Sequence, residues 1–278
     1  MVDRLAGFFR HYTFSARTFY TGNLCDHEVF DAQTGSGHLH LLRRGKLRVT
    51  SSAHAPLLLD EPSLLFYPRP ITHRFLIDCG ESADLVCAAI DLGANDGNPL
   101  AQALPSFLHM PFRNFPTIAG TVELLFSEAF DTHCGREGAI DRLTEYLLIQ
   151  LLRHVMDDSR NPLGLLAGLA DKRLAKALVA MHDDAAHPWT LASLATIAGM
   201  SRARFAIYFR EVLGMTPGDY LSRWRIGLAQ ELIRRGRPIN LIAAEVGYAS
   251  SSAFSRAFRA QTGQAPTAWS GKTLSSRS

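Results

Sequence analysis

The sequence predicts an α+β protein: an antiparallel β-barrel near the N-terminus, helices after it, and an all-α C-terminal domain with two helix-turn-helix motifs. Three observations support this prediction. Short strand-like segments fill the first third of the chain, a duplicated helix pattern fills the last third, and the two parts carry opposite net charge. With 278 residues, the chain is long enough for two ordinary domains.

The composition is that of a globular protein, with 47% hydrophobic and 20% charged residues. No apolar run approaches the ~18 residues that a membrane-spanning helix requires. The opening segment, MVDRLAGFFRHYTF, lacks the apolar core of a signal peptide. We therefore expect a cytoplasmic protein with reduced thiols and no membrane partner. The cysteines, which follow neither metal-site nor disulfide-framework spacing, are at positions 25, 79, 87 and 134.

Strand-like segments extend from about residue 20 to 95 and predict a small antiparallel barrel or sandwich. They are short and are bounded at roughly even spacing by Gly, Pro, Ser and Asp, as strands of all-β domains are. Upstream of them, Leu5, Phe8 and Phe9 indicate a short helix. The strand-like segments are HLHLLRRG, KLRVTSS, APLLLDE, SLLFYPR, THRFLID and ADLVCAAID.

The pattern becomes helical between about residues 100 and 157. Thr121–Phe130 and Ile140–Met156 both place apolar residues at a spacing of 3.6. The apolar stripe of the second segment is broad, and two interpretations stay open: burial in the domain core, or a dimer surface. The stripe consists of Ile140, Leu143, Leu147, Leu148, Leu151, Leu152 and Val155.

A domain boundary is predicted within residues 157–168, DDSRNPLGLLAG, which are polar at first and then rich in Pro and Gly. We expect a first domain over residues 1–160, with the barrel at about 20–95 and helices at about 100–157. A linker over 161–170 and a second domain over 171–278 follow.

The second domain is organised around Gly247–Pro266, GYASSSAFSRAFRAQTGQAP. Its serine cluster offers N-cap hydroxyls, and Phe254 and Phe258 lie on one apolar helix face. A shorter run with helical spacing, INLIAAEVG, precedes it. Two short helices joined by a Gly-containing turn predict a helix-turn-helix motif over about 239–262.

The same pattern occurs 49 residues earlier. Both copies read Phe-x-x-x-Phe-Arg-x-x-x-Gly-x-x-Pro, beginning at Phe205 and at Phe254. An internal repeat indicates a duplicated supersecondary unit. We therefore expect a second helix-turn-helix motif over about 191–213, and one long helix within Met215–Arg235 that joins the two motifs.

The charge is distributed unevenly between the two domains. Residues 171–278 contain 15 Lys and Arg against 7 Asp and Glu, whereas residues 1–170 contain 14 against 19. A basic domain joined to an acidic one is typical of nucleic-acid binding by the basic part. A basic solvated face alone gives the same count, so the duplicated motif is what favours nucleic acid.

These two copies resemble the AraC/XylS family of bacterial transcription regulators. The resemblance covers residues 171–278 throughout, and the string from Gly247 to Pro266 is its most specific part. The strand region resembles the cupin-like sensor and dimerisation domain of many family members. That second resemblance rests on HLHLLRRGKLRV and LLFYPRPITHRF.

The resemblance implies a sequence-specific DNA-binding transcription regulator that is not an enzyme and requires no cofactor. The expected partner is double-stranded DNA at promoter sites, bound by a homodimer in the bacterial cytoplasm at the nucleoid. We expect an activator, which implies contact with RNA polymerase, and a small molecule or an oxidant as the signal. The alternative is a cupin-type metalloenzyme fused to a DNA-binding module.

A recognition helix presents its first turns to base edges in the major groove. Arg256 can form two parallel hydrogen bonds to guanine, whereas Ala206 and Ile207 can read only shape or a thymine methyl group. Arg210 and Arg259 are late in their helices, so we expect phosphate contacts or structural ion pairs there. The full set of expected DNA contacts is Arg202, Ala203, Arg204, Ala206, Ile207, Arg210, Ser250, Ser251, Ser252, Ser255, Arg256 and Arg259.

Three histidines of the strand region resemble part of the cupin metal set. His38 and His40 share one face of a strand by their spacing of two, and His73 lies where the third His of the pattern belongs. The Glu of the pattern is missing, because Arg43 and Arg44 occupy its region. Three neutral imidazoles can still hold zinc with one position open. The alternative is that they line a pocket or are hydrogen-bonded at strand ends.

Cys25 and Cys87 are the thiols that we consider for oxidant sensing. Both lie in or beside the strand region, and a barrel can bring distant strands together. A redox-active thiol requires a low pKa and an exposed position near a cation, and His27 lies two residues from Cys25. The alternatives are small buried hydrophobic residues and a small ligand inside the barrel. The signal therefore stays open between these thiols and the histidines.

Overall fold

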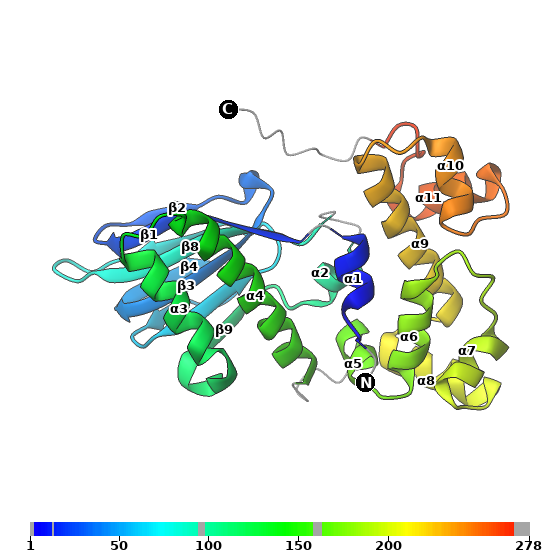
Figure 1. The fold of residues 1–278 in the computed structure, drawn as a ribbon, viewed down its shortest axis with the longest axis horizontal. Helices are drawn as coiled ribbons and strands as arrows, with labels where there is room; N and C mark the ends of the chain where they lie inside the picture. The colour runs from blue at the N-terminus through cyan, green and yellow to red at the C-terminus, as the bar shows by residue number, and fades with distance from the viewer. Residues whose placement is uncertain (1–2, 13, 94–97, 158–162, 270–278) are drawn as a thin grey trace. The chain divides into compact units, whose positions relative to one another are not determined.

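The structure, a computed structural model, describes residues 3–12, 14–93, 98–157 and 163–269. The chain forms two compact units, both visible in Figure 1. The barrel unit comprises residues 14–95 and 104–154. The helical unit comprises residues 1–13, 96–103 and 155–278.

Two antiparallel sheets make up the barrel unit. The larger sheet has the order β1-β8-β3-β6-β9, and the smaller one has the order β2-β7-β4-β5. All pairings are antiparallel, which confirms the predicted fold class. The strands are β1 (Ser15–Leu24), β2 (Glu28–Phe30), β3 (Gly37–Gly45), β4 (Leu47–Ser51), β5 (Leu57–Leu59), β6 (Ser63–Tyr67), β7 (His73–Leu76), β8 (Ala83–Asp91) and β9 (Leu108–Pro111).

Side chains from both sheets form one apolar core. Leu42, Leu65 and Leu85 of the larger sheet belong to the same buried cluster as Val49 and Phe75 of the smaller sheet. Burying each such side chain contributes about 1.5–3 kcal/mol. The packing of the two inner faces therefore holds the β3 and β7 strands, which carry the histidines, opposite each other.

Helices follow the strands, as the sequence predicts. The apolar stripe of α4 is core, since Leu147, Leu148, Leu151 and Leu152 are all buried within the chain. Of the seven stripe residues, only Leu143 is partly exposed, so most of the stripe is not available as a surface of this chain. The elements of this region are α3 (Ala119–Phe130) and α4 (Arg136–Asp157), with short 3-10 helices η1 (Ala32–Thr34), η2 (Phe112–Asn114) and η3 (Pro116–Ile118).

Polar residues of α4 cover the edge of the larger sheet. Asp141 accepts a hydrogen bond from the backbone N–H of Thr18 at 2.7 Å, and Glu145 accepts one from that of Ala16 at 3.3 Å. An exposed edge strand offers unpaired backbone groups to other chains. These two carboxylates occupy such groups on β1 and thereby close that edge.

The helical unit contains the two predicted helix pairs, and α9 runs from one to the other (Figure 1). Within the described residues, no helix combines the length and apolar composition needed to cross a membrane. The helices are α1 (Ala6–His11), α2 (Pro99–Ala103), α5 (Leu165–Ala170), α6 (Leu174–Asp183), α7 (Leu191–Ala198), α8 (Arg202–Leu213), α9 (Pro217–Arg234), α10 (Ile239–Glu245) and α11 (Ser251–Thr262).

One segment differs from its expected conformation. Residues 161–170 are expected to be a linker, yet residues 165–170 form α5. Their sequence, LLAGLA, is apolar enough to bury Leu165, Leu166 and Leu169, and burial of an apolar helix face is what stabilises so short a helix. Residues 161 and 162 lie outside the described part of the chain.

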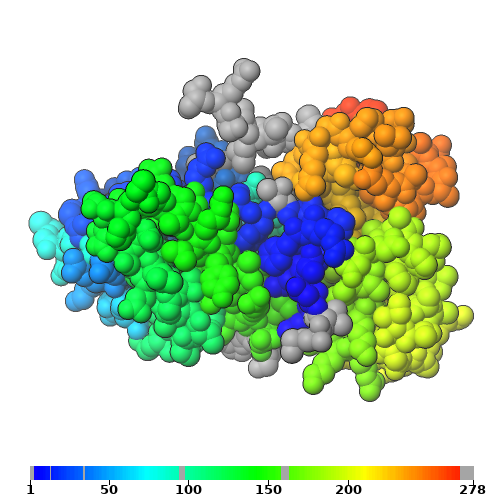
Figure 2. Space-filling model, in the orientation of Figure 1, coloured from blue at the N-terminus to red at the C-terminus, as the bar shows by residue number. Residues whose placement is uncertain are grey.

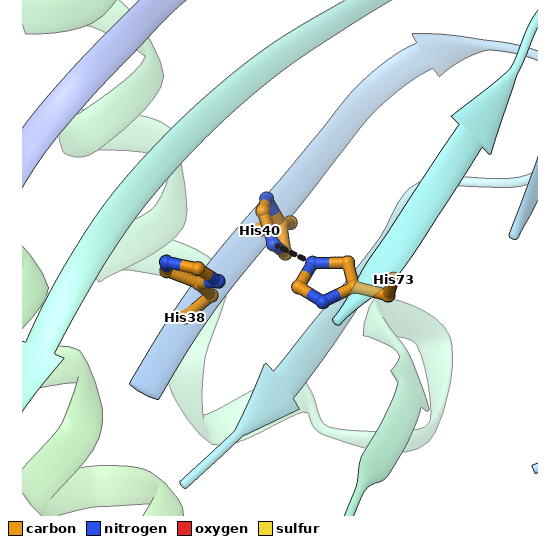
Figure 3. A group of neighbouring side chains, drawn as sticks. All are labelled: His38, His40 and His73. Atoms are coloured by element: carbon orange, nitrogen blue, oxygen red, sulfur yellow. Dashed lines mark hydrogen bonds between the residues drawn. The ribbon is translucent and has the colours of Figure 1, made fainter. Parts of the chain in front are cut away.

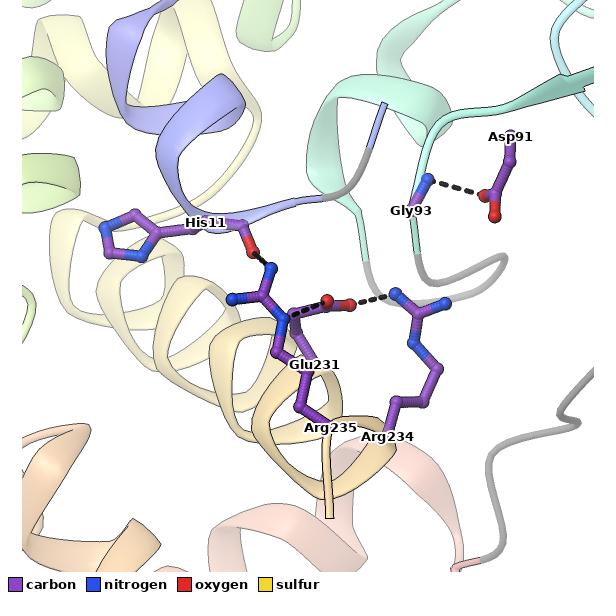
Figure 4. A network of polar contacts seen from close by, with 6 residues as sticks. All are labelled: His11, Asp91, Gly93, Glu231, Arg234 and Arg235. Carbon is purple, nitrogen blue, oxygen red and sulfur yellow. Dashed lines mark hydrogen bonds and ion pairs between the residues drawn. The ribbon is translucent and has the colours of Figure 1, made fainter. Parts of the chain in front are cut away.

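The first helix of the chain contributes to the core of the helical unit. The ring of Phe8 meets the ring of Trp224 edge-on at 5.1 Å and that of His182 at 4.8 Å. Arg235, just after α9, donates to the backbone oxygen of His11 at 3.1 Å (Figure 4). Residues from the first domain expected over 1–160 thus share a core with residues beyond position 171.

Candidate functional site

The first turns of α8 and α11 form exposed surfaces of the helical unit. Each helix begins at a capping serine, Ser201 or Ser250, whose hydroxyl accepts a hydrogen bond from the backbone N–H three residues later. Each helix also buries both of its phenylalanines completely. Figure 2 shows the first motif in yellow-green and the second in orange, each with an exposed surface. The fixed start and the buried pair determine which side chains point outward.

The predicted DNA contacts are exposed with one exception, since Ala206 is partly buried. Ile207 is 55% exposed, so its apolar side chain is available to a partner. Exposure permits contact with DNA, and the individual contacts stay predictions. The exposed residues are Arg202, Ala203, Arg204, Ile207, Arg210, Ser250, Ser251, Ser252, Ser255, Arg256 and Arg259.

Arg204 packs against a neighbouring aromatic ring. Its guanidinium lies over the ring of Tyr208 at 5.3 Å, and the Tyr208 hydroxyl donates to Asp171 at 2.9 Å. Within the described residues, Arg210 and Arg259 form no ion pair. The two roles expected for Arg210 and Arg259, phosphate contact and structural ion pair, stay predictions.

His38, His40 and His73 converge inside the barrel unit (Figure 3). The first two lie on β3 and the third on β7 of the opposite sheet. One ring nitrogen of each lies within 4.8 Å of the others, and the Nε2 atoms of His40 and His73 are 2.8 Å apart. All three side chains are buried. His38 and His40 are expected to share one face of a strand, and His73 joins them to form a cluster of three histidines.

Burial keeps these histidines neutral. It lowers the pKa of His38 and of His40, and it lowers the pKa of His73 to about 4. The Nδ1 atom of His73 donates to the backbone oxygen of Ile71 at 2.8 Å, which leaves its Nε2 atom unprotonated. The Nδ1 atoms of His38 and His40 lack hydrogen-bond partners among the described residues. A neutral imidazole fixed by a backbone carbonyl is the form that binds metal.

Two further residues extend this cluster and are not evident from the sequence. The ring of Tyr67 stacks on that of His73 at 4.0 Å, and its hydroxyl donates to Nε2 of His54 at 2.7 Å. His54 lies between β4 and β5, where no spacing rule connects it with β3. Among the described residues, no carboxylate belongs to the cluster, and Arg44 instead pairs with Asp84.

Cys25 and Cys87 are not neighbours. In the ladder of β1 and β8, Cys87 pairs with Tyr20. Cys25 follows Leu24, the partner of Ala83, so it is five residues, or about 17 Å, along the strands from Cys87. Cys87 is buried and its pKa is raised by that burial, whereas Cys25 is exposed. This arrangement lacks the Cα separation of a disulfide, and Cys87 is not a low-pKa thiol.

Comparison with known proteins decides the family. Residues 3–157 match a family described as Cupin, and residues 194–272 match one described as Helix-turn-helix domain. An uncharacterized HTH-type transcriptional regulator of Haemophilus influenzae is 30% identical over 256 residues, covering 84% of this chain and 85% of the relative. A putative AraC-like transcription regulator of Streptomyces lividans is 36% identical over 193 residues, covering 67% and 63%. The chain belongs to the AraC/XylS family.

Two further proteins are similar to this chain. The RCS-specific HTH-type transcriptional activator RclR of Escherichia coli K12 is 27% identical, covering 84% of this chain and 85% of RclR. The DNA-binding domain of AdpA, solved with a target DNA, is 28% identical with a TM-score of 0.34, covering 35% and 89%. This AraC/XylS protein is a DNA-binding transcription regulator with a cupin domain, and its relatives are regulators rather than enzymes.

Proposed function

We propose that this AraC/XylS protein binds promoter DNA through α8 and α11 together and activates transcription when its cupin domain receives a signal. One observation carries the proposal: α8 and α11 belong to one helical unit, and each begins at a capping serine with an exposed first turn. The major groove admits an α-helix, and two such helices suit successive grooves about 10 bp apart. The basic charge of residues 171–278 favours the phosphate backbone.

The arginines divide between base reading and phosphate contact in this binding mode. Arg256, in the second turn of α11, donates to a guanine edge. Arg202 supplies the corresponding donor at the start of α8, and Ile207 meets a thymine methyl group. Arg210 and Arg259, which lie three residues beyond Ile207 and Arg256 respectively, contact phosphates.

The activator role is tested with a reporter gene under a promoter that the protein binds. We expect transcription to fall when Arg256 is replaced by alanine, because promoter occupancy falls. Transcription that rises in the Arg256→Ala variant would show repression instead. An exposed arginine of the barrel unit, Arg17, provides the matched control as Arg17→Ala.

For the signal, we propose a divalent metal at His38, His40 and His73, with a small-molecule ligand at its open position. Three neutral imidazoles that converge from two sheets are a donor set that zinc accepts. The Nε2 atoms of His40 and His73 are in hydrogen-bond contact at 2.8 Å. A tetrahedral zinc ion with Zn–N bonds of about 2.0–2.1 Å separates two nitrogen ligands by about 3.3 Å, so the two rings must move apart by about 0.5 Å to hold one ion. The geometry favours this site over the thiols, because Cys87 is buried and distant from Cys25.

Metal analysis of the purified chain tests this site. We expect about one equivalent of bound metal in the wild type, since the cluster offers one set of three ligands. His40→Ala should lose that metal, and the exposed His133→Ala should keep it. Wild-type protein that remains metal-free after incubation with zinc would contradict the metal proposal. The alternative would then be a ligand that binds among the three histidines without a metal.

We also propose a homodimer that contacts RNA polymerase at promoters in the bacterial cytoplasm, where the DNA lies. Because six of the seven residues of the α4 stripe are buried and only Leu143 is partly exposed, we expect the dimer surface to use other apolar side chains. Leu124 of α3 is 59% exposed and Tyr146 of α4 is 48% exposed. Sedimentation of the full chain should show a dimer that Leu124→Glu converts to a monomer, while Leu58→Glu on β5 does not. A monomeric wild type would contradict the proposed dimer.

A further inference from the structure

A second contact, in addition to α9, joins the two helix-turn-helix motifs. We call α6, α7 and α8 the first lobe, and α10 and α11 the second lobe. A single helix is one attachment, and helices bend. The structure shows another attachment where residues 184–189, which connect α6 to α7, meet the turn between α10 and α11.

Arg225 of α9 lies at the centre of this second attachment. Its Nε atom donates to the backbone oxygen of Ala185 at 2.7 Å, and its Nη2 atom donates to that of His187 at 3.0 Å. Its guanidinium also lies over the ring of Tyr248, 5.8 Å from the ring centre. The two oxygens belong to the first lobe and Tyr248 to the turn of the second. One side chain on the joining helix therefore contacts both lobes.

The turn approaches the first lobe so closely that only glycine fits at position 247. Gly247 has a φ of 87°, and a Cβ atom there would lie 2.7 Å from Cα of Ala186 and 2.9 Å from the oxygen of Ala185. Those atoms are backbone and cannot rotate away. The same Cβ would lie 2.8 Å from Nη2 of Arg225. The backbone of the second turn therefore lies in direct contact with the backbone of the first lobe, with no room for a side chain between them.

Hydrogen bonds extend this contact to the recognition helix of the second lobe. The hydroxyl groups of Tyr248 and Ser222 are 3.3 Å apart. Gln261 of α11 donates to the Ser222 hydroxyl at 2.9 Å. Both the turn before α11 and the last turn of α11 are therefore tied to α9 on the side that carries Arg225.

We propose that Arg225 is a positioning residue that sets the distance and rotation between α8 and α11, and thereby the spacing of the two DNA segments that the protein accepts. The inference rests on the proposed binding of both helices to DNA. One added base pair shifts the second segment by about 3.4 Å and rotates it by about 34°. Lobes held at two points cannot follow this change, whereas lobes joined by α9 alone can swing to follow it.

The experiment measures the affinity of the full chain for duplexes that carry the wild-type site, with its own spacing or with one base pair inserted between the two segments. We expect the wild type to bind the altered duplex at least about tenfold more weakly. Arg225→Gln should bind the original duplex about threefold to tenfold more weakly and distinguish the two duplexes by less than about threefold. Arg223→Gln removes an exposed charge from the same helix and should keep the wild-type ratio.

If Arg225→Gln keeps the wild-type ratio of affinities for the two duplexes, the positioning role is overturned. This holds also when the variant loses affinity equally for both duplexes and is less thermally stable. Arg225→Lys keeps the charge with fewer donors in a fixed geometry, so its ratio should be intermediate. If Arg225→Gln does not fold, Gly247→Ala is judged by the same ratio, because it displaces the turn and keeps the arginine. A wild type that binds both duplexes alike contradicts the two-helix binding mode itself.

Discussion

The two helix-turn-helix motifs share their buried residues and differ in their exposed ones. Each recognition helix begins at a capping serine, buries two phenylalanines and ends at a glycine with positive φ. On the exposed face, Ile207 of α8 occupies the position of Arg256 in α11. Arg202 of α8 likewise occupies the position of Ser251. The capping, buried and terminal glycine positions are needed to form each helix, so the two motifs share them. The exposed positions do not pack inside the domain, so they can differ according to the partner that they contact.

This difference implies that the two helices read DNA unequally. The arginine expected to read a base from α11, Arg256, is in its second turn, whereas α8 places Arg202 at its first residue. Ile207 offers no donor and can contact only apolar groups such as a thymine methyl. We therefore expect one segment of the site to be specified more strongly than the other.

The equivalence of the two cores is tested by Phe205→Ala and Phe254→Ala. Both rings are fully buried, so each truncation should lower the free energy of unfolding by about 3–5 kcal/mol. Ile207→Ala, at an exposed position of the same helix, should change it by less than about 0.5 kcal/mol. Urea unfolding followed by circular dichroism measures all three. A large loss in only one phenylalanine variant would break the equivalence.

The pH response should differ between the lobes, since only the first has a buried histidine and no histidine follows residue 187. Burial lowers the pKa of His182 to about 3, and its Nε2 atom is 2.6 Å from the Tyr220 hydroxyl. The unfolded chain takes up this proton near pH 6.5, so the stability contributed by neutral His182 is lost as the pH falls from about 6.5 towards 3. Between pH 7 and pH 5 this loss is roughly 2 kcal/mol. In urea unfolding, the free energy of unfolding of His182→Gln should depend less on pH by about this amount. An unchanged pH dependence would contradict the role given to His182.

The unequal faces are tested by Arg256→Ala and Ile207→Ala. Loss of a bidentate contact should cost Arg256→Ala about 1–3 kcal/mol at one base pair and relax the preference there. Ile207→Ala should cost less, because only an apolar contact is removed. Competition binding against duplexes with each base pair substituted gives both values. Full retention of preference at every position in Arg256→Ala would remove Arg256 from the base-reading set.

The smallest effect is expected where the motifs agree. Arg210 and Arg259 are equivalent positions, so either alanine variant should weaken binding to all sequences alike. Each should also reduce the slope of log affinity against log salt by about 1. A salt titration on specific and random duplexes measures this slope. A sequence-dependent loss in either variant would show base contact instead.

The sequence predicts the helical motifs well because their signals are local. Serine caps, the Phe254 and Phe258 spacing and a terminal glycine all lie within one helix. The contact of Phe8 with Trp224 joins residues more than 200 positions apart, and no local pattern indicates it.

The sensor site is predicted only in part for the same reason. The spacing of His38 and His40 shows that they share a face, because side chains alternate along a strand. Which strand of the second sheet lies opposite depends on the packing of β3 against β7, so the addition of Tyr67 and His54 required the structure. The register of β1 against β8, rather than the strand order, separates Cys25 from Cys87.

Unequal reading of DNA by two motifs of one chain is tested most directly by selecting binding sites for the wild-type protein from random DNA. We expect two preferred segments with centres about 10 bp apart, different in sequence and in strength of preference. A single preferred segment per chain, or two segments of identical sequence and strength, would contradict this binding mode.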